Sequence, residues 1–132
     1  MKTIHRNQGF TMVELIVVVA IVSALAGMAI PFYNSYVDKA KLTLSLSALS
    51  ILKKALDSYS MEHGDYPGTL DFSTFTDQNG VAITDVSVID QIKGNVFSFD
   101  SYIFATSTYT LRAKGVDSTH TVITVTPDKI TH

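Results

Sequence analysis

The order of apolar and charged residues divides the chain into three stretches. No charged side chain occurs between Leu15 and Val37, and this first stretch is apolar all round. Apolar residues then recur at steps of three and four up to residue 62, and from residue 96 the period shortens to two. Together these patterns predict a long helix, apolar all round and then on one side, followed by a small sheet.

The second half of the predicted helix carries one apolar stripe. No helix-breaking residue follows Pro31 until His63 and Gly64, so we expect a single helix over residues 11–62. The stripe consists of Val37, Ala40, Leu44, Ala48, Ile51, Ala55 and Tyr59. A helix with one apolar face lies on a folded domain, so the stripe is predicted to face the core.

The clearest strand pattern lies near the C-terminus. Residues 109–114 alternate apolar and polar side chains, and residues 121–126 are β-branched throughout and stop at Pro127. Residues 96–99 and 102–106 predict two further short strands, separated by a turn at Asp100 and Ser101.

The fold class predicted from these elements is α+β. Three to four antiparallel strands are expected to pack on the C-terminal half of the long helix. Residues 69–95 have no clear pattern, and a short helix or strand is expected only around residues 81–92.

Composition excludes several classes of function. The chain has 132 residues, enough for one domain, and its formal net charge is −2. The ten basic residues are scattered, which argues against nucleic-acid binding. Without cysteines the chain has no disulfide or thiolate nucleophile, and its four histidines lie far apart in sequence. No catalytic constellation is recognisable, so we expect no enzyme.

Two general interpretations fit the N-terminus. Lys2 and Arg6, the apolar residues 13–22 and a small-residue cleavage site ending at Ala26 match a secretory signal peptide. The apolar residues 15–36 are also long enough to cross a membrane as a signal anchor.

Glu14 stands directly before this apolar run and needs its own explanation. A carboxylate at the bilayer centre costs on the order of 2.5–3.5 kcal/mol on insertion scales. Thr11 and Glu14 have the spacing of a capping box, in which the two residues satisfy backbone N–H groups at a helix start. The residues alone leave local capping and a functional role equally open.

The string Gly9-Phe10-Thr11-Met12-Val13-Glu14-Leu15, with Pro31 inside the apolar helix behind it, resembles the prepilin signature of type IV pilins and type II secretion pseudopilins. Met12 stands where the family usually has leucine. The resemblance implies cleavage between Gly9 and Phe10 by a prepilin peptidase on the cytoplasmic side. It also implies N-methylation of Phe10.

The same resemblance assigns roles within the helix. It implies that Glu14, next to Thr11, pairs with the N-terminal amine of a neighbouring subunit. Pro31 has no N–H to donate to the carbonyl of Gly27, and glycine is itself a poor helix former. The family leads us to expect that this Gly27–Pro31 segment loosens when subunits assemble.

The expected organisation is a removed leader (residues 1–9), a transmembrane and assembly helix (10–36) and a globular head (37–132). The expected function is that of a structural subunit of a type IV pilus or a similar filament, or alternatively of a type II secretion pseudopilin. A secreted binding protein cleaved after Ala26 is the rival from another class.

Partners and location follow from the same resemblance. The expected partners are the prepilin peptidase, other copies and related pilins, an inner-membrane assembly platform and, before assembly, membrane lipid. The precursor is expected to cross the inner membrane once, with Lys2 and Arg6 in the cytoplasm. The filament would then be periplasmic or on the cell surface.

A calcium ion is the one cofactor that the resemblance suggests. Major pseudopilins hold calcium with oxygens of C-terminal loops, and Asp100, Asp117 and Asp128 lie at predicted strand ends. No EF-hand spacing occurs, so solvated turn aspartates are the alternative interpretation.

Overall fold

The computed structural model of the chain describes residues 9–132. Its contacts divide the chain into two compact units, Met1–Tyr36 and Val37–His132, and the longest helix contributes to both. The elements are α1 (Met12–His63), α2 (Val86–Asn95), β1 (Val96–Ala105), β2 (Thr108–Gly115), β3 (Val122–Val125) and β4 (Ile130–Thr131). We call the second unit, residues 37–132, the head.

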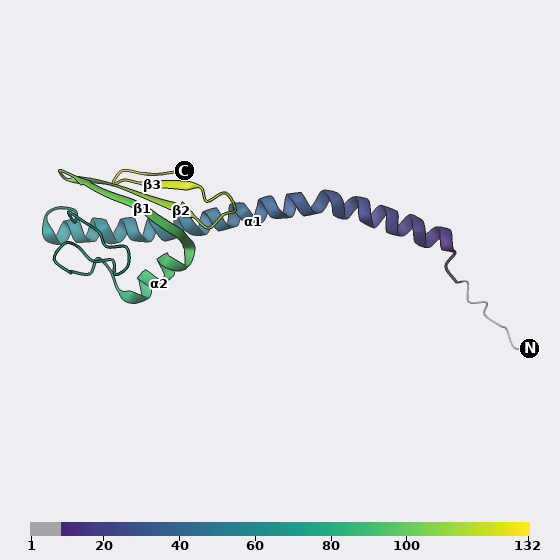
Figure 1. Cartoon of the computed structure of the whole chain (residues 1–132), viewed down its shortest axis with the longest axis horizontal. Helices are drawn as coiled ribbons and strands as arrows, with labels where there is room; N and C mark the ends of the chain where they lie inside the picture. The colour runs from purple at the N-terminus through teal and green to yellow at the C-terminus, as the bar shows by residue number, and fades with distance from the viewer. Residues whose placement is uncertain (1–8) are drawn as a thin grey trace, which may run out of the picture. The chain divides into compact units, whose positions relative to one another are not determined.

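The head is an antiparallel sheet packed on one helix. Its four strands follow each other in the order β1-β2-β3-β4, so each strand pairs with its neighbour in the chain. In Figure 1 these strands, green to yellow, run along the teal second half of α1. The predicted α+β class, a long helix with a small antiparallel sheet, is confirmed.

Strand β2 supplies the centre of the core from the sheet side. Tyr109, Leu111 and Ala113 are buried and the residues between them are more exposed, as the alternation in the sequence predicts. Ile123 and Val125 of β3 continue the same buried surface.

The predicted turn at Asp100 and Ser101 is wrong, because β1 runs through both residues. Its pairing with β2 shifts register twice, between Val96 and Ser98 and again between Phe99 and Ser101. Such bulges insert an extra residue and interrupt the alternation of side chains. In the sequence, the second bulge therefore looked like a break between two strands.

The predicted stripe on α1 is confirmed at Ala48 and Tyr59, which are buried, but it is wrong at its N-terminal end and omits the buried leucines. Leu44 is 52% exposed and Ala40 is exposed, whereas Leu49, Leu52 and Leu56 are fully buried or nearly so. The buried face consists of Ser45, Ala48, Leu49, Leu52, Leu56 and Tyr59. Burying leucines removes more apolar surface from water than burying alanines, so the helix turns its leucines inward.

Helix α1 ends where the sequence predicts, within one residue. Gly64 has a φ of 85°, a left-handed conformation that favours glycine, and its N–H donates to the carbonyl of Ser60 at 2.8 Å. This hydrogen bond closes the last turn of the helix, and the connection to α2 begins after it.

The connection between α1 and α2 is tied to the core by a buried pair. The Tyr59 hydroxyl donates to Oδ2 of Asp77 at 2.6 Å. This bond lowers the pKa of Asp77 and raises the pKa of Tyr59 to about 12. Helix α2 then adds Ile89 and Ile92 to the core, where the sequence had indicated only a short helix or strand.

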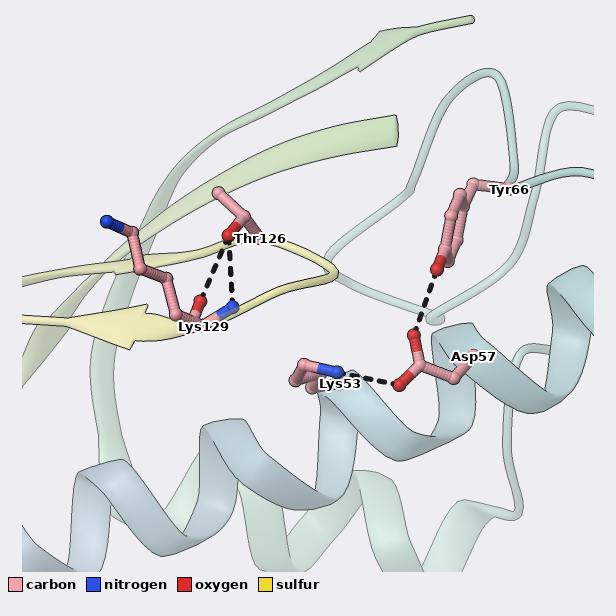
Figure 2. A network of polar contacts seen from close by, with 5 residues as sticks. All are labelled: Lys53, Asp57, Tyr66, Thr126 and Lys129. Atoms are coloured by element: carbon pink, nitrogen blue, oxygen red, sulfur yellow. Dashed lines mark hydrogen bonds and ion pairs between the residues drawn. The ribbon is translucent and has the colours of Figure 1, made fainter. Parts of the chain in front are cut away.

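Figure 2 shows a second group of polar contacts in the head, between α1, the segment after it and the β3–β4 turn. The carboxylate of Asp57 on α1 accepts hydrogen bonds from Nζ of Lys53 at 2.8 Å and from the hydroxyl of Tyr66 at 3.1 Å. Close by, the hydroxyl of Thr126 donates to the carbonyl of Lys129 at 3.1 Å and so closes the β3–β4 turn.

Candidate functional site

In the described part of the first unit, residues 9–36, helix α1 has no covered face. Every residue from Gly9 to Tyr36 is exposed, including large apolar side chains such as Val17, Ile21 and Leu25. Within residues 9–132, α1 is the one helix that is long and apolar enough to cross a membrane, and none of its most apolar window is buried. An apolar surface of this extent requires a partner, either lipid or protein.

Thr11 and Glu14 form a reciprocal capping box at the start of α1. Oε2 of Glu14 accepts the backbone N–H of Thr11 at 2.8 Å and the Thr11 hydroxyl at 2.9 Å. In return, the backbone N–H of Glu14 donates to Oγ1 of Thr11 at 3.2 Å. Two backbone N–H groups at the start of the apolar helix, those of Thr11 and Glu14, are thereby satisfied from within the chain.

This geometry leaves Glu14 able to take a second partner. Both hydrogen bonds from Thr11 end on Oε2, so capping does not occupy Oε1. The carboxylate is exposed, and a cationic donor could reach it from outside the chain. Local capping and pairing between subunits are therefore compatible in one conformation, although the sequence presented them as alternatives. The pairing role itself stays a prediction.

Gly9 and Phe10 precede this cap and are both accessible. Phe10 is 88% exposed, and a side chain added at Gly9 would meet no atom of residues 9–132 within 4 Å. The backbone between them lies outside the helix. The rest of the predicted leader, with Lys2 and Arg6, lies outside the described residues.

The Gly27–Pro31 segment is helical in the isolated chain. α1 continues through Pro31, and a side chain added at Gly27 would again meet nothing within 4 Å. Proline cannot donate the hydrogen bond that the Gly27 carbonyl would otherwise accept. The expected loosening on assembly stays a prediction.

The three aspartates proposed as calcium ligands have different partners in the head. Asp100 lies on β1, 3.7 Å from Nζ of Lys114, and Asp128 is exposed in the β3–β4 turn. Asp117 is buried in the β2–β3 loop, with its carboxylate turned to Thr119 and Thr121. No group of three or more His, Cys, Asp or Glu residues within 9–132 is placed to hold a metal ion. Calcium binding stays a prediction.

Asp117 instead organises its own loop. It accepts hydrogen bonds from the hydroxyls of Thr119 and Thr121, the latter at 2.8 Å, and from the Thr121 backbone N–H at 3.2 Å. Burial acts to raise the pKa of Asp117, but these hydrogen bonds outweigh it and lower the pKa to about 2.

The β2–β3 loop is also fastened to α1, which the sequence did not indicate. Asp38 accepts the Ser118 hydroxyl at 2.6 Å and its backbone N–H at 3.1 Å. Next to it, the backbone N–H of Val116 donates to the buried hydroxyl of Ser45 at 3.1 Å. Ser45 and Val116 are 71 positions apart in the sequence, and Asp38 and Ser118 are 80 positions apart. No local spacing predicts contacts over such separations.

Replacing Asp117 with asparagine is expected to remove part of the acid sensitivity of the head. The pKa of this carboxyl is lower in the folded head than its ordinary value of 3.8, so its contribution is present above about pH 4. That contribution, about 2 kcal/mol, is lost as the pH falls from about 4 through about 2. Asp117→Asn should therefore unfold at lower urea at pH 7, and the gap to wild type should narrow below pH 3. Asp128→Asn, at an exposed position, is the matched control. A constant gap over this range would contradict the assignment.

Comparison with known proteins supports the N-terminal half of this description. A family model described as the prokaryotic N-terminal methylation motif matches residues 4–30. A fimbrial protein of Neisseria meningitidis serogroup B is 37% identical over 62 residues, which are 47% of this chain and 36% of that protein. A second fimbrial protein, from serogroup A, is 32% identical over 85 residues, 62% of this chain and 50% of the relative.

A type II secretion protein is similar to the same degree. The type II secretion system core protein G of Pseudomonas aeruginosa is 36% identical over 65 residues, 49% of this chain and 46% of that protein. The chain thus spans about a third to a half of the length of these curated relatives. No solved structure matches the chain significantly. Over its N-terminal half, which carries the methylation motif and the exposed apolar helix, the chain is similar to type IV pilins and type II secretion pseudopilins.

Proposed function

We propose that this chain is the structural subunit of a type IV pilus or of a similar filament, and that it polymerises through residues 10–36. The observation that carries this proposal is the uncovered apolar surface of α1 directly behind the capped prepilin motif. A helix apolar on every side is stable in water only when other apolar groups surround it. Copies of the same helix provide that cover in a filament.

The precursor would first be covered by lipid. In the proposed sequence, the chain crosses the inner membrane once, and prepilin peptidase cuts it between Gly9 and Phe10 and methylates Phe10. An assembly platform in the membrane then transfers it into the filament. The head, residues 37–132, has a core of its own and stays in water throughout.

The intact mass of the processed protein tests this proposal. We expect a species that begins at Phe10 and carries one added methyl group, because the resemblance to the prepilin signature implies a cut after Gly9. Mass spectrometry of the protein purified from membranes measures it directly. A species beginning at Gly27 would show cleavage after Ala26 and support a secreted protein instead.

Two variants make this measurement sharper. Gly9→Leu should block the predicted cut and leave the full precursor in the membrane. Ala26→Leu should block ordinary signal peptidase but leave the cut at Gly9 unchanged. If Ala26→Leu leaves the full precursor uncut and Gly9→Leu is still cleaved, the filament proposal is wrong.

A pseudopilin of a type II secretion system is the second candidate, since core protein G matches as well as the fimbrial proteins do. Filament length distinguishes the two functions. Long surface fibres composed mainly of this chain, seen by electron microscopy, would favour a pilus subunit. A short filament that forms only with a secretion apparatus would favour a pseudopilin.

A further inference from the structure

Exposed aromatic residues mark the end of the apolar part of α1. Phe32, Tyr33 and Tyr36 are 68%, 68% and 71% exposed. The first charged residues after Glu14, Asp38 and Lys39, follow at once. The other large side chains of the run, such as Val18 and Ile21, are aliphatic. The aromatic residues are therefore concentrated where the apolar run ends.

The length of the run fits the hydrocarbon thickness of a bilayer. Residues 15–32 span about 27 Å of helix, at a rise of about 1.5 Å per residue. A bilayer has a hydrocarbon core about 30 Å thick, and somewhat thinner cores occur. When Glu14 lies at one boundary of this core, Tyr33 and Tyr36 lie at the other.

Tyrosine suits that boundary chemically. Its ring is apolar and its hydroxyl is polar, so it gains most where hydrocarbon meets the headgroups. Tyr33 and Tyr36 are three residues apart in α1, so they lie next to each other on one face of the helix. Both residues are exposed in the part of the chain that the structure describes.

We propose that Tyr33 and Tyr36 are an interfacial anchor, which binds the headgroup region of a lipid bilayer and fixes the depth of the precursor. This inference rests on the proposed membrane-bound precursor and assigns the residues that position it. The anchor holds Glu14 at the opposite boundary, so the carboxylate is not placed at the centre of the bilayer. Gly9 and Phe10 then lie on the aqueous side of that boundary, where a peptidase can reach them.

The chain contains no tryptophan, so a single substitution provides a unique fluorescent reporter of depth. The full chain is reconstituted in phosphatidylcholine–phosphatidylglycerol vesicles that contain lipids brominated either near the headgroup or near the ends of the acyl chains. Tyr33→Trp and Tyr36→Trp are the test variants. Val22→Trp, near the middle of the run, is the deep control. Phe97→Trp, at an exposed position of the head, is the solvent control.

We expect the Tyr33→Trp and Tyr36→Trp reporters to lose most fluorescence with shallow bromines, and the Val22→Trp reporter with deep bromines. Suppose that deep bromines quench Val22→Trp, but that the reporters at positions 33 and 36 are either not quenched or quenched mainly by deep bromines. The tyrosines then do not anchor the helix at the headgroups, although the helix does insert into the bilayer. If Val22→Trp is no more quenched than Phe97→Trp, the helix does not insert. That result overturns the membrane-bound precursor together with the anchor.

A second measurement asks whether the tyrosines set the depth. In the Val22→Trp background, the pair Tyr33→Leu and Tyr36→Leu extends the apolar run toward Asp38 and moves its midpoint away from residue 22. The reporter should therefore shift toward the shallow bromines. An unchanged depth would show that the charged residues after the run fix the position, and it would refute an anchoring role for the tyrosines.

Discussion

Glu14→Ala is expected to abolish filament assembly. The prepilin signature implies that the Glu14 carboxylate pairs with the N-terminal amine of the neighbouring subunit, and an α-amine is largely cationic at neutral pH. Removing one member of a buried ion pair typically costs about 3–5 kcal/mol, because the other charge is left uncompensated. At each subunit contact this corresponds to a loss of roughly 100-fold or more in association. Sedimentation of sheared filaments measures the yield.

Two further variants separate this pairing from the capping box. Glu14→Gln removes the charge but keeps an oxygen that can accept the Thr11 N–H, as capping boxes with glutamine do. It should fail to assemble almost as completely as Glu14→Ala. Thr11→Ala keeps the charge and weakens the cap, so assembly should be reduced far less. If Glu14→Gln assembles normally, capping is the only role of this residue.

Leu56→Ala is expected to destabilise the head by about 2–5 kcal/mol. Leu56 is fully buried between α1 and the sheet, and removing its side chain leaves a cavity in a close-packed core. The loss is a large part of the stability of a domain of this size. Urea denaturation of the full chain in detergent, followed by tyrosine absorbance, measures the shift.

Leu44→Ala is the matched control for this variant. The apolar stripe predicted from the sequence included Leu44 and omitted Leu56, whereas the structure exposes the first and buries the second. The same chemical change should therefore cost under about 1 kcal/mol at Leu44. Equal losses at the two positions would mean that the helix packs in another rotation.

The features that local sequence predicted correctly depend on neighbouring residues. The capping box needs only Thr11 and Glu14, and the end of α1 needs only Gly64. The alternation of β2 is likewise a property of eight consecutive residues. In each case the interaction that decides the structure is visible within one segment.

The features that sequence missed depend on residues brought together from a distance. The apolar stripe failed because Ala40 and Leu44 satisfy the same periodicity as the buried leucines, and only the position of the sheet decides between the two faces. The bulge in β1 is defined by its partner strand. The Asp38–Ser118 contact spans 80 positions, so no motif on either side predicts it.

The contacts between the β2–β3 loop and α1 affect when the head can fold during synthesis. Asp38 and Ser45 contact Ser118 and Val116, so the first helical turns of the head are completed by residues of the β2–β3 loop, 71 to 80 positions later in the chain. Closing such distant contacts is entropically costly and slow. A nascent chain that has emerged only as far as residue 100 lacks β2, β3 and the loop that binds Asp38. The contacts of Asp38 and Ser45 can therefore form only after residue 118 has emerged, and until then this part of the helix face lacks its cover.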